Sequence, residues 1–67
     1  MKLVVNGDAF EVEADPVTVD VLVSRLGLEG QRVAVEVNRR IIRRAAWAET
    51  ALAEGDAVEV VHFVGGG

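Results

Sequence analysis

The chain opens with two short runs of alternating apolar and polar residues, in the stretch KLVVNGDAFEVEA. A period of two is typical of β-strands with one buried face, and Asn6-Gly7 between the runs readily adopts the positive φ angles of a tight hairpin turn. The pattern therefore predicts a β-hairpin. Four side chains are expected on its buried face: Leu3, Val5, Phe10 and Val12.

The period changes after Pro16, in the stretch VTVDVLVSRLG. Apolar residues recur there at i, i+3, i+4 and i+7, the spacing of one face of an amphipathic helix. These residues are Val19, Leu22, Val23 and Leu26. Thr18 stands at the N-cap position and Gly27 at the left-handed stop, so one main helix is predicted to cover the hairpin.

The second half of the chain returns to strands. RVAVEVN and AVEVVHF alternate as strands do, RRII adds a short strand, and Trp47 and Leu52 are expected to be buried at a short helical turn. The order β-β-α-β-(β)-β predicts an α+β fold, with one mixed sheet of four to five strands and one main helix packed across it.

The last strand predicts an interaction surface. Val58 and Val60 should face the core, which turns Val61 and Phe63 outward on the same face as a glutamate. Val4 of the first strand is expected to join them. An exposed apolar group on an otherwise acidic domain is typical of a docking surface.

Composition restricts the possible functions. At 67 residues the chain is expected to form one domain, and its lack of cysteine excludes disulfides and thiol catalysis. A net charge of −4 disfavours nucleic acid, and no apolar run is long enough to cross a bilayer, so we expect a cytoplasmic protein without nucleic-acid or membrane partners. The arginines of RRIIRR form either a solvated face or a docking patch for an acidic partner.

Neither a catalytic residue nor a metal site is predicted from the residues. His62 has no nucleophile beside it in sequence, the carboxylates lack metal-ligand spacing, and no glycine-rich phosphate loop joins a strand to a helix. The most unusual feature of the sequence is the stretch GGG at 65–67. We expect residues 1–64 to form a folded domain and residues 65–67 to form a flexible glycine tail. It is either a frayed end or a reagent that could enter a narrow channel with the Gly67 carboxylate.

A resemblance to a known family covers essentially the whole chain, and three stretches carry it: VVNG, VAVEVNRRIIRRAAW and LAEGDAVEVVHFVGGG. They resemble the sulfur-carrier proteins of thiamine (thiazole) biosynthesis, a ubiquitin-like β-grasp family. The final stretch is the most specific, because glycine-aspartate, a β-branched strand and a terminal double glycine recur there together. One departure is Arg43, where the family usually has a proline ahead of the arginine that Arg44 matches.

The resemblance implies a protein-bound sulfur donor and not an enzyme. An ATP-dependent adenylating enzyme would activate the Gly67 carboxylate, a persulfide donor would supply sulfur, and the resulting thiocarboxylate would serve thiazole synthase. Gly66 and Gly67 match the functional double glycine of the family, whereas Gly65 extends it. No cofactor is expected to be bound, since ATP is used by the adenylating partner.

Other functions remain open at the level of sequence. The small subunit of molybdopterin synthase shares the fold and the tail, and a ubiquitin-like modifier would use the same activated terminus to form isopeptide bonds. A passive interaction domain with an inert tail would undergo no ATP-dependent change at all.

Overall fold

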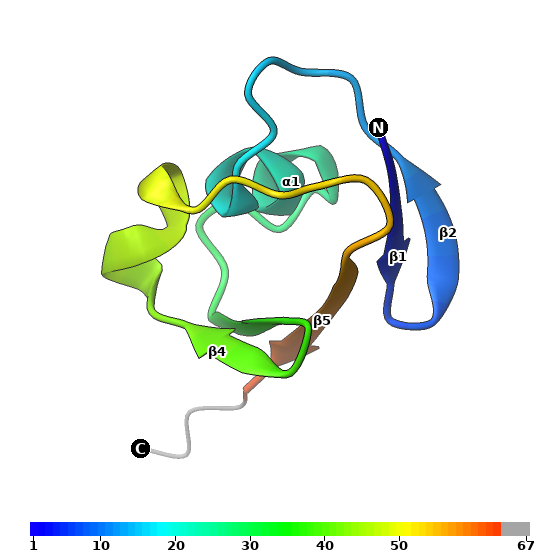
Figure 1. The fold of residues 1–67 in the computed structure, drawn as a ribbon. Helices are drawn as coiled ribbons and strands as arrows, with labels where there is room; N and C mark the ends of the chain where they lie inside the picture. The colour runs from blue at the N-terminus through cyan, green and yellow to red at the C-terminus, as the bar shows by residue number, and fades with distance from the viewer. Residues whose placement is uncertain (64–67) are drawn as a thin grey trace.

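The computed structural model describes residues 1–63, in which a five-stranded sheet is covered on one face by an α-helix (Figure 1). The elements in chain order are β1 (Lys2–Val5), β2 (Asp8–Glu11), α1 (Val19–Arg25), β3 (Val33–Val37), β4 (Arg40–Ile42), the 3-10 helix η1 (Arg44–Glu49) and β5 (Ala57–His62). The predicted α+β fold, with its mixed sheet and one main helix, is therefore confirmed.

The last strand in sequence lies in the middle of the sheet, whose order is β2-β1-β5-β3-β4. β5 runs parallel to β1, with Val5 opposite Val58, and antiparallel to β3, from Val33 opposite His62 to Val37 opposite Val58. The two outer pairs are antiparallel hairpins. Thus β5 joins two hairpins that are otherwise separate within the sheet.

The first hairpin forms as predicted, with one correction to its buried face. Asn6 and Gly7 take φ angles of 50° and 86° at its turn. Leu3 and Val5 are buried, but Phe10 is only half-buried because β2 is an edge strand with a neighbour on one side. Val12 lies beyond the end of β2 and is nevertheless buried, and its N–H donates to the Met1 carbonyl over 2.9 Å.

Helix α1 is short and is fixed by packing and by its C-terminal stop. It buries Val19, Leu22 and Val23 against the sheet. The hydroxyl of the N-cap residue Thr18 donates to the Asp20 carboxylate and makes no capping bond to the backbone. At the other end Gly27 has a φ of 76°, and the Leu28 N–H donates to the Val23 carbonyl over 3.1 Å, the long bond of a Schellman motif.

Trp47 closes one end of the core, as the sequence predicts. Its side chain is 6% exposed, and its indole Nε1 donates to the carbonyl of Ile42 over 2.9 Å. Leu52 is also buried, and the core continues through the inward residues of β3 and β5. Within residues 1–63, no helix combines the length and the apolar character needed to cross a membrane.

Candidate functional site

The side chain of Asn6 fixes β5 beside β1, which has already ended at Val5. Its amide oxygen accepts the Val60 N–H over 2.8 Å, and its amide nitrogen donates to the Val60 carbonyl over 3.1 Å. The amide therefore imitates a strand residue and extends the contact between β1 and β5. Sequence reasoning recognised Asn6 only as a turn residue.

Asn38, in the turn between β3 and β4, fixes the beginning of β5 in a related way. Its amide oxygen accepts the Ala57 N–H over 3.0 Å, and its amide nitrogen donates to an Asp56 carboxylate oxygen over 3.1 Å. Its own N–H donates to the Ala57 carbonyl over 2.7 Å. β5 is thus held from both sides by asparagine side chains.

The sheet face opposite α1, here called the outer face, carries the three predicted docking residues. Val4, Val61 and Phe63 are 40%, 56% and 50% exposed. Val4 is separated from the other two, because it lies opposite Ala57 and Glu59 intervenes along β5 before Val61. The predicted exposure is therefore observed, but Val4 stands apart from the end of β5.

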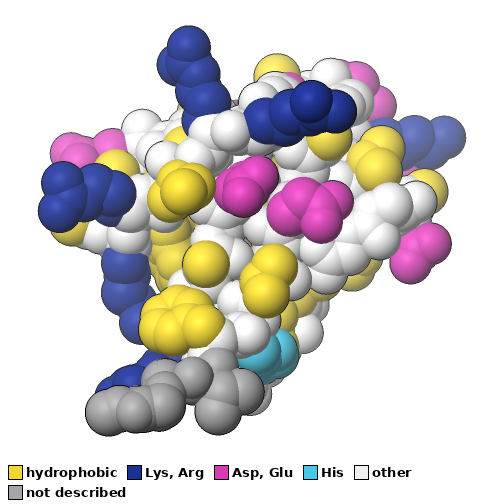
Figure 2. All heavy atoms as spheres, turned by 90° about the horizontal axis from the view of Figure 1, so that it is seen from below, with side chains coloured by type: hydrophobic (Ala, Val, Ile, Leu, Met, Phe, Trp, Pro, Cys, Tyr) yellow, Lys and Arg dark blue, Asp and Glu magenta, His cyan; other side chains and the backbone are white. Residues whose placement is uncertain are grey.

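Two residues that sequence reasoning did not assign to this surface join Val61 and Phe63. Ala34 lies directly opposite Val61, and Ile41, which pairs with Glu36, is 74% exposed. We call Ala34, Ile41, Val61 and Phe63 the apolar patch. Figure 2 shows hydrophobic side chains gathered on this face next to the end of the described chain. The signal for Ile41 in the sequence was its place as the first of two adjacent isoleucines between four arginines, since adjacent residues of a strand face opposite sides of the sheet.

The chain remains attached to the sheet as far as its last described residue, since the Phe63 N–H donates to the Arg32 carbonyl over 3.3 Å. The imidazole of His62 lies 2.8 Å from the amide oxygen of Gln31. The predicted site residues Gly65, Gly66 and Gly67, and with them the domain boundary after residue 64, lie outside the described residues.

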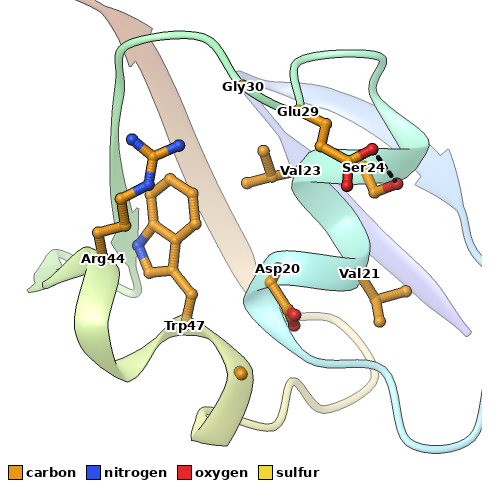
Figure 3. A pocket seen from close by; sticks show the side chains of 9 residues that line it. Asp20, Val21, Val23, Ser24, Glu29, Gly30, Arg44 and Trp47 are labelled. Carbon is orange, nitrogen blue, oxygen red and sulfur yellow. Dashed lines mark hydrogen bonds between the residues drawn. The ribbon is translucent and has the colours of Figure 1, made fainter.

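A shallow groove separates α1 from η1 on the other side of the molecule (Figure 3). Its volume is about 470 Å³, and Arg44 lies on one wall with its guanidinium carbon 5.0 Å from the centre of the Trp47 ring. On the α1 side, the Ser24 hydroxyl donates to Glu29 over 3.5 Å. The lining residues include no histidine that could activate this serine, and no metal-binding cluster of His, Cys, Asp or Glu occurs in residues 1–63.

The described residues thus provide a fixed central strand and an exposed patch at its end, a geometry suited to presenting a chain segment to another protein. A family model described as the ThiS family matches residues 3–67. The sulfur carrier protein ThiS of Bacillus subtilis is 38% identical over 65 residues, which are 97% of this chain and 98% of that protein.

The chain is also similar to a solved structure and to regions of larger proteins. The crystal structure of the thiamine biosynthesis protein ThiS from Geobacter metallireducens matches with a TM-score of 0.84 and 39% identity, covering 100% of both chains. A protein of Paramagnetospirillum magneticum named thiazole synthase is 42% identical over the whole of this chain. The chain spans only 20% of the length of that protein, and also 20% of a thiazole synthase of Magnetococcus marinus.

Proposed function

The chain belongs to the ThiS family, and on that basis we propose that it is a sulfur carrier for thiamine biosynthesis, a protein-bound substrate and not a catalyst. The observation that carries the proposal is that the family match extends through residue 67 and so includes Gly66 and Gly67. The Bacillus relative, which is named a sulfur carrier protein and which this chain covers almost completely, supports the same function.

The proposed chemistry takes place on the carboxylate of Gly67. A carboxylate oxygen attacks the α-phosphorus of ATP and pyrophosphate leaves, which converts a poor electrophile into an acyl-adenylate. The terminal sulfur of a persulfide then attacks the acyl carbon and AMP leaves. A thiol cleaves the sulfur–sulfur bond of the product, releasing a thiocarboxylate and a disulfide. The chain contributes the acyl group, while ATP is bound by the adenylating partner.

Glycine suits the residues before this carboxylate for a steric reason. Each extended residue spans at most about 3.3–3.6 Å, so three extended residues would place the reacting atom up to about 10 Å from the domain. Without a β-carbon they can pass through a channel that excludes any other residue. Gly65 lengthens this reach beyond the double glycine.

We further propose that the outer face is the docking surface for the adenylating enzyme and for thiazole synthase, with Phe63, Val61 and Val4 in contact with these partners. The two relatives named thiazole synthase support the second partner, because each contains a region similar to this whole chain. A cytoplasmic location fits a reaction that consumes ATP.

The test uses ATP–pyrophosphate exchange by the adenylating enzyme of the source organism. The intact mass of the natural protein first establishes whether Gly67 is its last residue, as the proposal requires. Deletion of Gly67 withdraws the carboxylate by about 3.5 Å, whereas attack requires atoms within about 3–3.5 Å, so exchange should be lost. Gly66→Leu should block exchange by steric hindrance, with Gly66→Ala as the graded control.

All variants should unfold at the wild-type temperature, since the buried core is formed by residues between Leu3 and Val60. Incubation of the wild type with enzyme, ATP and a persulfide donor should then replace one oxygen by one sulfur in the intact mass. Equal exchange by wild type, the Gly67 deletion and Gly66→Leu would refute the assigned role of the glycines.

A further inference from the structure

Two arginines on the outer face flank the end of β5. Arg32 stands immediately before the buried Val33 and Arg43 immediately after the inward-facing Ile42, so alternation along the strands places both side chains on the outer face. The Phe63 N–H donates to the Arg32 carbonyl over 3.3 Å, which fixes Arg32 beside the last described residue. We call Arg32 and Arg43 the cationic rim.

Two glutamates oppose each other further along the same face. Glu36 on β3 and Glu59 on β5 are direct partners in the antiparallel register, and Glu36 is half-buried. Like charges in this arrangement destabilise a sheet. The pair borders a hollow that is also lined by Asn38, Arg39 and Ala57. We call these two residues the acidic pair.

Within residues 1–63, these four charges form no ion pairs. Among residues 1–63 the one ion pair joins the N-terminal ammonium to Glu11, 3.2 Å apart. The repulsion within the acidic pair is therefore not offset by a salt bridge in the described part of the chain. A charged group on another molecule would relieve it.

The apolar patch lies among these charges, because Ile41 is opposite Glu36 and Arg43 follows Ile42 beside Ala34. Val61 and Ala34, which oppose each other, are two residues from the acidic pair along both strands and two residues from Phe63 and Arg32 in the other direction. From the end of β5 toward the turn between β3 and β4, the outer face therefore carries first the cationic rim, then the acidic pair, and beyond it Arg39, which lines the same hollow as the pair. Figure 2 shows carboxylates near the centre of this face, hydrophobic side chains between them and the end of the described chain, and basic side chains at several points around the edge of the face.

We propose that this order of charges sets the orientation in which the outer face docks on its activating partner. The cationic rim meets carboxylates around the opening that receives the glycine segment, and the acidic pair meets a basic side chain, for which a guanidinium has the matching bidentate geometry. The inference rests on the function proposed above and adds to it the charge pattern of the partner.

The physical basis is the division of roles within a protein interface. An apolar patch provides contact area but allows the partners to bind in several rotated orientations. Complementary charges steer the encounter and disfavour complexes with the wrong orientation. A half-turn rotation of this face would bring its carboxylates against an acidic opening. Repulsion would then disfavour that complex.

A variant with the charges exchanged provides the test. Arg32→Glu and Arg43→Glu combined with Glu36→Arg and Glu59→Arg keep the net charge at −4 and retain a like-charge pair across β3 and β5. The matched control exchanges two exposed charges that do not lie on the outer face, Arg40→Glu with Glu49→Arg, again without changing net charge. Arg40 precedes Ile41 but is opposite Val37, so alternation turns its side chain away from the outer face. Phe63→Asp serves as the positive control for loss of the apolar contact.

Affinity for the adenylating enzyme is measured by calorimetry at two ionic strengths, beside the KM for the carrier in ATP–pyrophosphate exchange. We expect the exchanged variant to bind about 10- to 100-fold more weakly, with KM raised and kcat nearly unchanged, and the control to remain within about threefold of wild type. Wild-type affinity should fall as salt rises, and the exchanged variant should lose that dependence.

The outcomes separate the two proposals. Wild-type affinity in the exchanged variant, with normal exchange activity, would overturn the orientation role and leave the carrier function intact. Absence of exchange with the wild type would overturn the carrier function and the orientation role together.

If the exchanged variant unfolds at a lower temperature, Arg32→Glu with Arg43→Glu alone should still weaken binding by about tenfold. An equal effect of Arg40→Glu combined with Arg25→Glu, two reversals that do not lie on the outer face, would reduce the result to net charge and refute the proposal.

Discussion

At the scale of a single residue, Trp47 combines packing with a polar contact. Its ring is 6% exposed, its Nε1 donates to the Ile42 carbonyl, and Arg44 lies over its face. The indole therefore ties the end of β4 to η1 and fills the space between them and the helix. The packing and the hydrogen bond both depend on this side chain, so Trp47→Ala removes both.

Trp47→Ala is expected to lower the free energy of unfolding by about 3–5 kcal/mol, which is much of the stability of a small domain. Trp47→Phe retains an aromatic ring but leaves the Ile42 carbonyl without its donor, and should have a smaller effect, about 1–3 kcal/mol. Urea titration followed by circular dichroism measures both changes. An unchanged midpoint and slope for Trp47→Ala would contradict its structural role.

Sequence reasoning succeeded and failed at this scale for identifiable reasons. Burial of Trp47 follows from its bulk and its position between apolar residues. The double hydrogen bond from Asn6 to Val60 spans 54 positions of sequence. These two bonds form because β5 lies beside the turn. The composition and periodicity of the sequence do not encode which strand lies there.

At the scale of elements, the Asn6 amide takes the place of a strand residue between β1 and β5. Asn6→Gly accommodates the φ of 50° yet removes both hydrogen bonds to Val60, so it should destabilise the fold by about 1–3 kcal/mol. Hydrogen exchange at the Val60 amide should accelerate more than at Val35. Asn6→Asp keeps the acceptor and loses the donor, and we expect an intermediate effect. Wild-type stability in Asn6→Gly would show that solvent replaces the amide without loss.

Elements themselves were largely predictable, because apolar spacing changes from two to 3.6 and back along the chain. Their order in the sheet was not, since pairing of β5 with β1 and β3 is a long-range choice. For the candidate site, the exposure of Val61 and Phe63 followed from alternation. The separation of Val4 from them, and the proximity of Ala34, follow only from the register.

At the scale of the whole molecule, the sheet depends on β5 as its central connection. A chain that stops after Asp56 retains β1 with β2 and β3 with β4, but these hairpins have no strand to join them. Isolated hairpins are marginal in water, so we expect no cooperative thermal transition. A chain that stops after Phe63 is the matched control and should unfold cooperatively. A sigmoidal transition in the shorter chain would show that α1 and the hairpins suffice.

The central position of β5 also has a consequence for the moment at which this protein acquires its shape. A ribosome makes residues 57–62 after the four other strands, at about 5–20 residues per second, so the nascent chain carries two unjoined hairpins until almost all of the domain has been made. The sheet can therefore close only after β5 has been made, and a copy released before residue 57 stays open to proteases. Protein quality control would in this way remove the chains that lack the strand leading to the glycines.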